Sequence, residues 1–342
     1  MRKKKEVTMQ GIADQLKISK VTVSKALNDK DGVSEDLKER IKEIAINLGY
    51  KKMSSEPTQE TKNNVAIMVR ERYVTRTDHI SFYLKFYQKI ATALNNRGYM
   101  CNLFTLSDEK QKGVELPKLF FEDYISGVIV MGDINRKYIE EIKKLEIPIV
   151  FLDYYNSDNE YDCILTDNYY STYELTNYLL QNGHTDIGFV GNIHSTSSIQ
   201  DRYLGYYRSL LEAKLAINEE WIISDRDEDG DEVEFVLPMT MPSAFVCNCD
   251  DTAYKFINYL KKNNYQIPED ISIVGFDNDI YAEICEPKLT TIAINMEAMT
   301  QKVTSKIIAY IENRVEDKKT RIFVTGHIIY RDSVKKMKRR EM

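Results

Sequence analysis

The stretch TMQGIADQLKISKVTVSKALN, residues 8–28, decides the fold of the N-terminal part of the chain. Thr8 is a good N-cap for a short helix with its apolar residues on one face. Ser19 is a second N-cap, placed soon after that helix ends. Two helices this short, joined by so few residues, cannot lie antiparallel around a core. We therefore predict that they cross steeply as a helix-turn-helix, whose second helix enters the DNA major groove.

A third helix is predicted to follow this pair. Ser34 is its predicted N-cap, and Gly49 is predicted to end it. The negative charges of Glu35 and Asp36 in the first turn stabilise the helix through its dipole. Five apolar residues at helical spacing form its predicted inner face: Leu37, Ile41, Ile44, Ala45 and Leu48. A three-helix bundle without a nucleic-acid role is the alternative. The short turn, the two caps and the Lys, Ser and Thr side chains of the second helix together favour DNA binding.

The charge of the chain is divided between a basic head and an acidic body. The 342 residues carry a net charge of −6, which by itself argues against a nucleic-acid partner. Residues 1–53, however, hold 13 Lys/Arg and 8 Asp/Glu, so the remainder carries a net charge of −11. Attraction to phosphates is therefore confined to the head. We interpret the basic cluster at 335–340 as a solvated tail.

Length and composition predict a multidomain protein of the cytoplasm. No apolar run reaches the roughly 18–20 residues that span a membrane. The N-terminal MRKKKE is not followed by the apolar segment of a secretory signal. Among the five cysteines only Cys247 and Cys249 are close together, and no His is near them. We therefore expect no membrane association, no disulfide, no metal site and no cofactor, and we expect this pair to pack at a strand end.

Residues 54–63, SSEPTQETKN, are polar and predict a linker. Beyond it strands and helices alternate, which predicts parallel sheets with helices on both faces. The predicted strands are 65–69, 99–104, 128–131, 147–152, 187–190, 244–247 and 271–275. The predicted helices are 82–95, 109–124, 135–145, 171–181, 202–213, 252–262 and 296–311. Because the pattern occurs twice, we expect two lobes with a ligand cleft between them.

The head and the body both resemble the lactose/galactose-repressor (LacI/GalR) family of bacterial transcription factors. In the head the matching residues are Ile12-Ala13, Ile18-Ser19, Thr22-Val23-Ser24-Lys25, Leu27-Asn28, Val33-Ser34 and Leu48-Gly49-Tyr50. In the body they are Gly183-His184, Arg202-x-x-Gly205-Tyr206, Pro268 to Asp277, Pro287-x-Leu289-Thr290-Thr291-Ile292 and Arg331-x-Ser333.

This resemblance covers nearly the whole chain and implies its domain organisation. It implies an all-α helix-turn-helix headpiece at 1–53, a linker at 54–63, and a two-lobed α/β core like that of periplasmic binding proteins at 64–342. The core would bind the effector and form a homodimer. Its N-lobe would comprise residues 64–162 and 293–322, and its C-lobe residues 163–290 and 323–334.

The resemblance also implies sequence-specific binding to double-stranded DNA. Each headpiece of the dimer would contact one half-site, so the operator should be a near-palindrome. Lys20, Val21 and Lys25 are expected to face the bases, and the hydroxyl residues beside them to face phosphates. The predicted DNA-binding residues are Thr8, Ser19, Lys20, Val21, Thr22, Ser24, Lys25, Asn28 and Tyr50.

Two features of the head depart from the family pattern. Lys17 stands where the turn usually carries Gly, and a left-handed backbone there would cost about 1 kcal/mol. The segment after Tyr50 has no leucine where the family's hinge helix inserts into the minor groove.

Polar residues that follow the predicted strands indicate the effector site. Ligands of open α/β sheets bind beyond the carboxyl ends of the strands. There Asp153, Asp250 and Asp277 can accept hydrogen bonds from sugar hydroxyls, and Arg202 can donate to them. An Asp after a strand is also an ordinary turn or cap residue; the resemblance implies that Arg202 and Asp277 contact the effector. The predicted effector-binding residues are Phe82, Asp153, Ser198, Arg202, Asp250 and Asp277.

Two departures concern this effector site. Cys249 replaces an Asn common in the family and cannot offer the hydrogen bonds of an amide. Residues 225–242 are short and acidic for a strand-helix unit. We therefore expect an effector that differs from the sugars typical of the family.

The leading hypothesis is a repressor controlled by a small polar effector, a sugar or sugar derivative, that shifts the dimer between two arrangements. The same DNA role under a protein co-regulator is one alternative. A solute-binding protein is another, which the head and the missing signal peptide disfavour. An enzyme is a third, but the sequence has no GxxxxGK[ST], no GxGxxG after its first strand and no nucleophile elbow.

Overall fold

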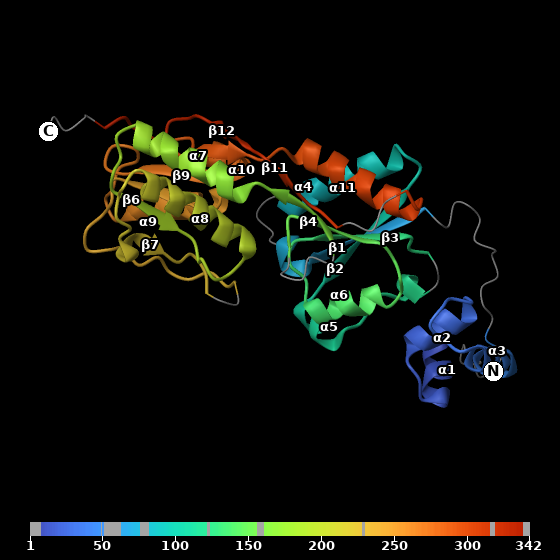
Figure 1. Cartoon of the computed structure of the whole chain (residues 1–342). Helices are drawn as coiled ribbons and strands as arrows, with labels where there is room; N and C mark the ends of the chain where they lie inside the picture. Colours follow the sequence, from blue (N-terminus) through green and yellow to red (C-terminus); the bar gives the residue numbers. More distant parts are fainter. Residues whose placement is uncertain are drawn as a thin grey trace. The chain divides into compact units, whose positions relative to one another are not determined.

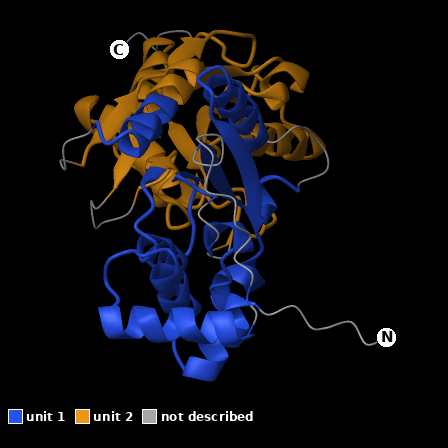
Figure 2. Ribbon diagram, turned by 90° about the vertical axis from the view of Figure 1, so that its right-hand side faces the viewer, with its two compact units in different colours: residues 1–76, 83–150, 303–318 blue, residues 77–82, 151–302, 319–342 orange. Residues whose placement is uncertain are grey.

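A computed structural model describes residues 8–48, 50, 63–75, 82–121, 124–155, 161–227, 230–314 and 319–337. The backbone contacts divide the chain into two compact units, each assembled from separate stretches (Figure 2). Unit 1 comprises residues 1–76, 83–150 and 303–318, and unit 2 comprises residues 77–82, 151–302 and 319–342.

Three helices form the headpiece, residues 8–48: α1 (Met9–Leu16), α2 (Lys20–Leu27) and α3 (Glu35–Leu48). Both predicted N-caps are confirmed. Thr8 Oγ1 accepts from the backbone N–H of Gly11 at 3.2 Å, and Ser19 Oγ accepts from that of Thr22 at 3.0 Å. Six small and branched apolar side chains form the shared core: Ile12, Ala13, Val23, Ala26, Ile41 and Ala45. Leu48, predicted to face inward, is 36% exposed.

Lys17 ends α1 in the left-handed conformation, with φ 55° and ψ 40°. This is the conformation that its place in the turn suggested, and it carries a strain of about 1 kcal/mol for a residue with a Cβ. Only Ile18 and the N-cap Ser19 separate this residue from α2.

The first sheet has six strands in the order β11-β5-β4-β3-β1-β2 (Figure 1). The strands are β1 (Asn64–Arg70), β2 (Met100–Leu106), β3 (Gly127–Met131), β4 (Ile149–Leu152), β5 (Asp162–Thr166) and β11 (Arg321–Val324). β1 pairs in parallel with β2 and β3, and β11 pairs in parallel with β5. The apolar runs of β1 and β3 are buried almost throughout, as expected for strands covered on both faces.

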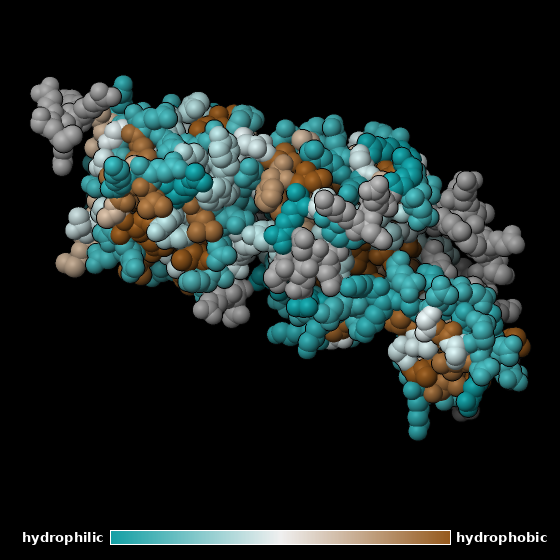
Figure 3. Space-filling view, in the orientation of Figure 1, coloured by the Kyte–Doolittle hydropathy of each residue, from teal (hydrophilic) through white to brown (hydrophobic). Residues whose placement is uncertain are grey.

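The helical segments near this sheet are η2 (Glu71–Tyr73), α4 (Phe82–Asn95), α5 (Asp108–Gly113), η3 (Lys118–Phe121), α6 (Arg136–Lys143) and α11 (Met296–Ile311). α4 and α11 lie on one face, and α5 and α6 lie on the other (Figure 1). The outward surface of α5 and α6 is hydrophilic (Figure 3). In α11, Met299, Val303 and Ile307 are fully buried, which confirms that its 3–4 spacing serves packing.

The second sheet has the order β12-β10-β9-β8-β6-β7, with β12 antiparallel to β10. Its strands are β6 (Ile187–Val190), β7 (Ile222–Ile223), β8 (Ala244–Cys247), β9 (Ser272–Asp277), β10 (Thr290–Ala293) and β12 (His327–Ile329). The helical segments around it are α7 (Asn168–Gln181), α8 (Ser197–Glu212), η4 (Glu219–Trp221), α9 (Asp250–Lys262) and α10 (Ile280–Ile284).

Each face of the second sheet has its own core. Phe189 and Phe276 pack with α7 and α8 on one face, and Phe245 packs with α9 and α10 on the other. α7 and α8 approach closely at Gly205, where a Cβ would lie 2.2 Å from the carbonyl oxygen of Tyr169. The Gly205-Tyr206 pair of the sequence motif therefore has a packing role.

Both sheets contain a topological switch point. β1 lies between β2 and β3, and β6 lies between β7 and β8. In each sheet the second strand in the sequence is therefore added on one side of the first strand, and the third is added on its other side. The loops after neighbouring strands diverge there, and this opening is where ligands of such sheets bind.

The predicted fold class is confirmed, and three details differ. Residues 109–124 do not form one helix, because Val114 adopts a left-handed φ of 52° that ends α5 before η3. β5, β7, β10, β11 and β12 were not predicted. The compact units change at residues 150/151 and 302/303, whereas the sequence placed the lobe boundaries at 162/163 and 293. Across the described residues, every helix is too short or too polar to cross a bilayer.

Candidate functional site

The first candidate site is the beginning of α2, where most of the predicted DNA-binding residues gather. Ser19 caps the helix, and its hydroxyl lies 2.8 Å from that of Thr22. Lys20, Val21 and Thr22 are partly exposed, and Thr8 caps α1. Asn28 is the C-cap of α2, and the N–H of Tyr50 donates to the carbonyl of Ala45 at 2.8 Å. One short helix thus offers the hydroxyl and ammonium groups that bind phosphates and base edges.

Three of these side chains contact other parts of unit 1. Lys20 Nζ lies 4.0 Å from the centroid of the Phe121 ring. Ser24 is 6% exposed, and its hydroxyl donates to the carbonyl of Phe121 at 3.2 Å. Lys25 Nζ pairs with Glu146 at 2.7 Å. These three side chains would have to leave their partners in order to contact DNA.

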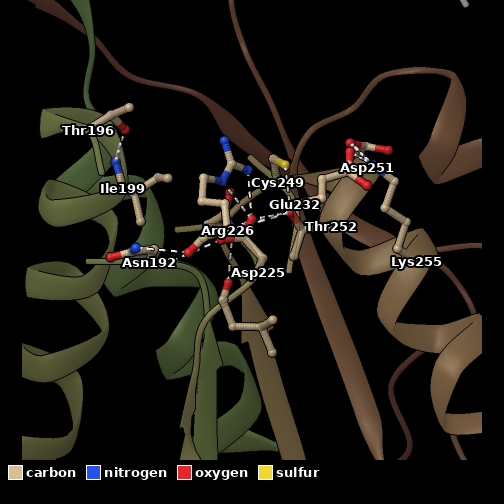
Figure 4. A network of polar contacts seen from close by, with 12 residues as sticks. Asn192, Thr196, Ile199, Asp225, Arg226, Glu232, Cys249, Asp251, Thr252 and Lys255 are labelled. Atoms are coloured by element: carbon tan, nitrogen blue, oxygen red, sulfur yellow. Dashed lines mark hydrogen bonds and ion pairs between the residues drawn. The ribbon is translucent and has the colours of Figure 1, made fainter. Parts of the chain in front are cut away.

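The second candidate site lies at the switch point of the second sheet and is built around Asp225, which follows β7 (Figure 4). Asp225 is 6% exposed. Its Oδ1 accepts from the N–H of Asn192, after β6, at 3.0 Å. Its Oδ2 accepts from Asn248 Nδ2, after β8, and from Thr252 Oγ1, on α9, both at 2.8 Å. We call these residues together with Arg226 the polar network.

Arg226 supplies the positive charge of the polar network, with Nη2 2.6 Å from Asp225 Oδ2. Burial works to raise the pKa of Asp225, but the hydrogen bonds and charge of Arg226, with those of Asn248 and Thr252, hold it below its usual range. The guanidinium extends toward Cys249 (Figure 4). Burial raises the pKa of the Cys249 thiol to about 12, so this residue presents a neutral S–H.

Arg202 lies on α8 and is held by several elements at once. Its Nε donates to Asn168 Oδ1 at 2.8 Å, and its Nη1 donates to the carbonyl of Asn248. Its Nη2 lies 3.5 Å from Asp277 Oδ1, and its guanidinium lies 3.8 Å from the ring centroid of Phe276. The structure therefore places Arg202 beside Asp277, and both residues were predicted to bind the effector. Asp277 has φ 111°, a strained conformation of the kind found at ligand sites.

Asp250 is placed differently from the other predicted carboxylates. It is fully buried, its Oδ1 accepts from Thr291 Oγ1 at 2.6 Å, and its Oδ2 accepts from the N–H of Asp279 at 3.0 Å. Burial and the charges of Asp277 and Asp279 raise its pKa well above the usual range. Its oxygens therefore connect α9 to β10 and to the N-cap of α10 instead of facing solvent.

The remaining predicted effector residues lie on separate elements. Asp153 follows β4 with φ 60°, and Phe82 is the first residue of α4. Ser198 lies in the first turn of α8, and its hydroxyl is 3.0 Å from that of Thr196.

The switch point of the first sheet holds a cluster that the sequence did not reveal. Arg70, the last residue of β1, has Nη1 2.7 Å from Oδ2 of Asp133, which follows β3. The hydroxyl of Tyr73 donates to the same carboxylate. The rings of Tyr73 and Tyr83 are 5.1 Å apart. Gly132 has φ 70°, and a Cβ there would lie 2.9 Å from Tyr83 Oη, so this arrangement requires glycine.

Sequence reasoning also missed the polar network. Asp225 and Arg226 lie two and three residues after β7, but that strand has only two residues and gives no periodic signal. Asn248 and Thr252 flank the predicted Asp250, so the motif Cys247-Asn248-Cys249-Asp250 was the available signal. No group of three metal-ligating side chains occurs among the described residues. Each edge by itself offers several hydrogen-bond donors and acceptors.

Two family models match the chain. The model of bacterial regulatory proteins of the lacI family matches residues 8–52, and that of the periplasmic binding protein-like domain matches residues 176–334. The transcriptional regulator RegA of Clostridium saccharobutylicum is 31% identical over 300 residues, covering 84% of this chain and 87% of RegA. The transcriptional repressor PurR of Vibrio campbellii is 26% identical over 339 residues, covering 96% of this chain and 99% of PurR.

Solved structures share the fold. The complex of the transcriptional regulator CelR with cellobiose superposes with a TM-score of 0.67 at 20% identity, covering 96% of this chain and all of CelR. The lac repressor dimer bound to operator and the anti-inducer ONPF superposes with a TM-score of 0.65 at 16% identity, covering 97% of this chain and all of that one.

Proposed function

This chain belongs to the LacI family of bacterial regulatory proteins, and from that premise we propose that it is a dimeric repressor of a near-palindromic operator, controlled by a small sugar-like effector. The single observation that carries the proposal is the headpiece. Two capped helices of eight residues each cross over a core of their own, and the second presents Lys20 and Lys25 on its partly exposed side. This is the geometry that places a helix in the major groove.

The dimer follows from the size of the contact surface. An eight-residue helix contacts only a few base pairs, so two headpieces are needed for a site that is distinguishable in a genome. The lac repressor, which has this fold, is a dimer on its operator. The same twofold arrangement here would relate the two half-sites by a twofold rotation, so the operator is an inverted repeat.

The effector is assigned to the carboxyl edges of the sheets. Arg202, Asp277 and the polar network present fixed donors and acceptors where the strands of the second sheet end. CelR, of similar fold, is found with cellobiose. A polyol would accept from Arg202 and donate to the carboxylates, and an effector that binds one arrangement of the dimer better shifts the population toward it.

The test of DNA binding uses an operator selected by the full chain from random duplexes. Lys25→Ala is expected to lower the ratio of specific to non-specific affinity by about 10–100-fold, because one base contact provides roughly 1–3 kcal/mol of discrimination. Lys137→Ala, an exposed lysine of α6, is the control and should leave the ratio unchanged. Fluorescence anisotropy on matched and scrambled duplexes gives both constants.

Salt dependence provides the second readout. The affinity of the wild type should fall as salt rises, because binding to the phosphate backbone releases counterions from the duplex. A wild-type protein that binds every duplex equally, or that shows no salt dependence, would overturn the proposed function. Calorimetric titration with sugars then distinguishes a small effector from a protein co-regulator.

A further inference from the structure

Three side chains of α2 contact the part of unit 1 that contains the first sheet. Their partners are Phe121, in η3, and Glu146, in the turn between α6 and β4, and we call these two residues the docking surface. We propose that α2 lies on the docking surface in the absence of DNA, so that the chain inhibits its own DNA binding. The inference rests on the proposed function, because it adds a regulation of the helix that contacts DNA there.

The three docked side chains belong to the set that the sequence predicts to contact DNA. Lys20 and Ser24 are neighbours on the helix surface, four residues apart, and Lys25 follows Ser24. Val23 and Ala26 of the same helix are fully buried and belong to the headpiece core. The part of α2 that is left to contact a duplex is therefore the part that contacts the docking surface, and the two contacts exclude each other.

Each contact uses a group that resembles one of those found on DNA. Lys25 Nζ lies 2.7 Å from Glu146 Oε1, so this carboxylate takes the place of a phosphate. The hydroxyl of Ser24 donates to the carbonyl of Phe121 at 3.2 Å, as it would to an oxygen of the duplex. Lys20 Nζ lies 4.0 Å from the centroid of the Phe121 ring, which attracts the cation. The docking surface thus offers an anion, an acceptor and an aromatic face to the same helix.

The docking surface is itself held by the structure around it. Phe121 is 6% exposed at the end of η3. The N–H of Glu146 donates to the carbonyl of Lys143 at 3.0 Å, which fixes the turn after α6. Ser24 is 6% exposed as well, so its hydroxyl is covered in the docked arrangement. These residues form a defined contact and not a chance approach of two exposed side chains.

The docked arrangement is loosely packed and can therefore be displaced. A cavity of about 300 Å³ remains beside the ion pair, lined among others by Val21 and Thr22 of α2 and by Glu141 of α6. Interiors that pack tightly leave few such gaps. The side chain of Glu146 is 57% exposed, and so exposed an ion pair contributes little to stability. A duplex can compete for α2, and docking lowers the apparent DNA affinity by the fraction of molecules that are undocked.

Zero-length crosslinking of the full chain tests the contact directly. A carbodiimide joins a lysine amine to a carboxylate only where the two groups touch, and mass spectrometry identifies the joined peptides. Without DNA we expect Lys25 to be joined to Glu146, and the yield should fall about fivefold or more with a saturating operator duplex. Lys255 and Glu232 of unit 2, which are 2.6 Å apart, are the control and should be joined equally with and without DNA. A mixture of isotope-labelled and unlabelled chains should show that the link lies within one chain.

Affinity measurements on variants provide the second readout. Glu146→Gln should bind the operator about 2–5-fold more tightly than the wild type, which is the range that an exposed ion pair provides. Adding Phe121→Leu keeps an apolar side chain but removes the ring that contacts Lys20, and the double variant should reach about tenfold. Glu109→Gln removes the same charge from an exposed position on α5 and should leave the affinity unchanged. If the double variant does not fold, Glu146→Gln alone decides.

A wild type in which Lys255 is joined to Glu232 but Lys25 is not joined to Glu146 would overturn the inference. So would a link between Lys25 and Glu146 that forms only between two chains or is undiminished on the operator. Equal operator affinities of Glu146→Gln and Glu109→Gln would overturn it as well. Intact operator binding without the crosslink rejects only this inference, whereas absent operator binding in both the wild type and Glu146→Gln rejects the proposed function.

Discussion

Asp225→Asn tests whether the polar network holds the edge of the second sheet together. The change is nearly isosteric, but it replaces one acceptor oxygen by an amide donor. If the remaining oxygen serves Arg226, Asn248 and Thr252, the amide faces the N–H of Asn192, and that buried donor loses its partner. An orphaned buried donor costs about 1–3 kcal/mol, and loss of the charged acceptor for Arg226 adds roughly 1 kcal/mol. We therefore expect the free energy of unfolding to fall by about 2–4 kcal/mol at pH 7.

The single tryptophan of the chain, Trp221, allows the unfolding of the second sheet to be followed by fluorescence. Trp221 lies in η4, directly before β7, and its Nε1 donates to the carbonyl of Thr240 at 2.7 Å. Urea unfolding followed by its fluorescence therefore reports on the second sheet. Glu220→Gln, the same chemical change at an exposed neighbouring position, is the control and should stay within about 0.5 kcal/mol of the wild type.

The pH dependence gives the sign of the effect. The pKa of Asp225 is lower in the folded than in the unfolded state, so the unfolded chain takes up the proton first as pH falls. The contribution of this carboxylate is complete above its unfolded pKa of about 3.9 and is lost as pH falls toward the folded value. The difference between Asp225→Asn and the wild type should shrink over that range. A variant as stable as the wild type at pH 7 would refute the reasoning.

Three further perturbations have defined outcomes. Burial lowers the pKa of His184, whose Nε2 lies 3.1 Å from the carbonyl oxygen of Lys335. The unfolded state therefore binds the proton more readily, and stability should fall as pH drops through about 6.5; His184→Asn should flatten that profile in pH-dependent unfolding. Gly132→Ala should destabilise the first sheet by more than Gly98→Ala, which should cost about 1 kcal/mol: both have positive φ, but a Cβ at Gly98 meets nothing within 4 Å. Equal thermal shifts would contradict this. Lys17→Gly should slow hydrogen exchange of the α1 amides by relieving up to about 1 kcal/mol of strain, and faster exchange would show that the entropy of glycine dominates.

Much of the fold could be predicted because its central elements have strong local patterns. β6, β8 and α11 have the predicted bounds. The two N-caps of the headpiece are hydroxyl residues that stand directly before segments whose apolar residues recur at helical spacing. Three of the strands that escaped prediction, β7, β11 and β12, lie at sheet edges. β7 has two residues, and β11 alternates exposed and buried side chains in a run of only four. The position of these strands depends on pairing with strands that are distant in the sequence. The local periodicity of a sequence does not indicate such pairing.

The residues of the candidate sites also differ in how far the sequence could predict them. Arg202 and Asp277 could be predicted because each belongs to a recognisable motif. The role of Asp225 depends on Asn192, which follows β6, and on Asn248 and Thr252, which follow β8; strand order brings these two segments beside β7. Asp250 follows a strand as the other predicted ligands do, but its carboxylate is buried and accepts from the Thr291 hydroxyl and from the N–H of Asp279.

The order of the strands has a consequence for synthesis. β11 supplies an edge strand to the first sheet and β12 supplies one to the second, and these two strands are only two residues apart near the C-terminus. The headpiece has all its residues by Leu48 and can fold while translation continues. Neither sheet can be completed before residues 321–329 leave the ribosome. A nascent chain therefore exposes the groups by which it binds DNA long before the domain that regulates them is finished.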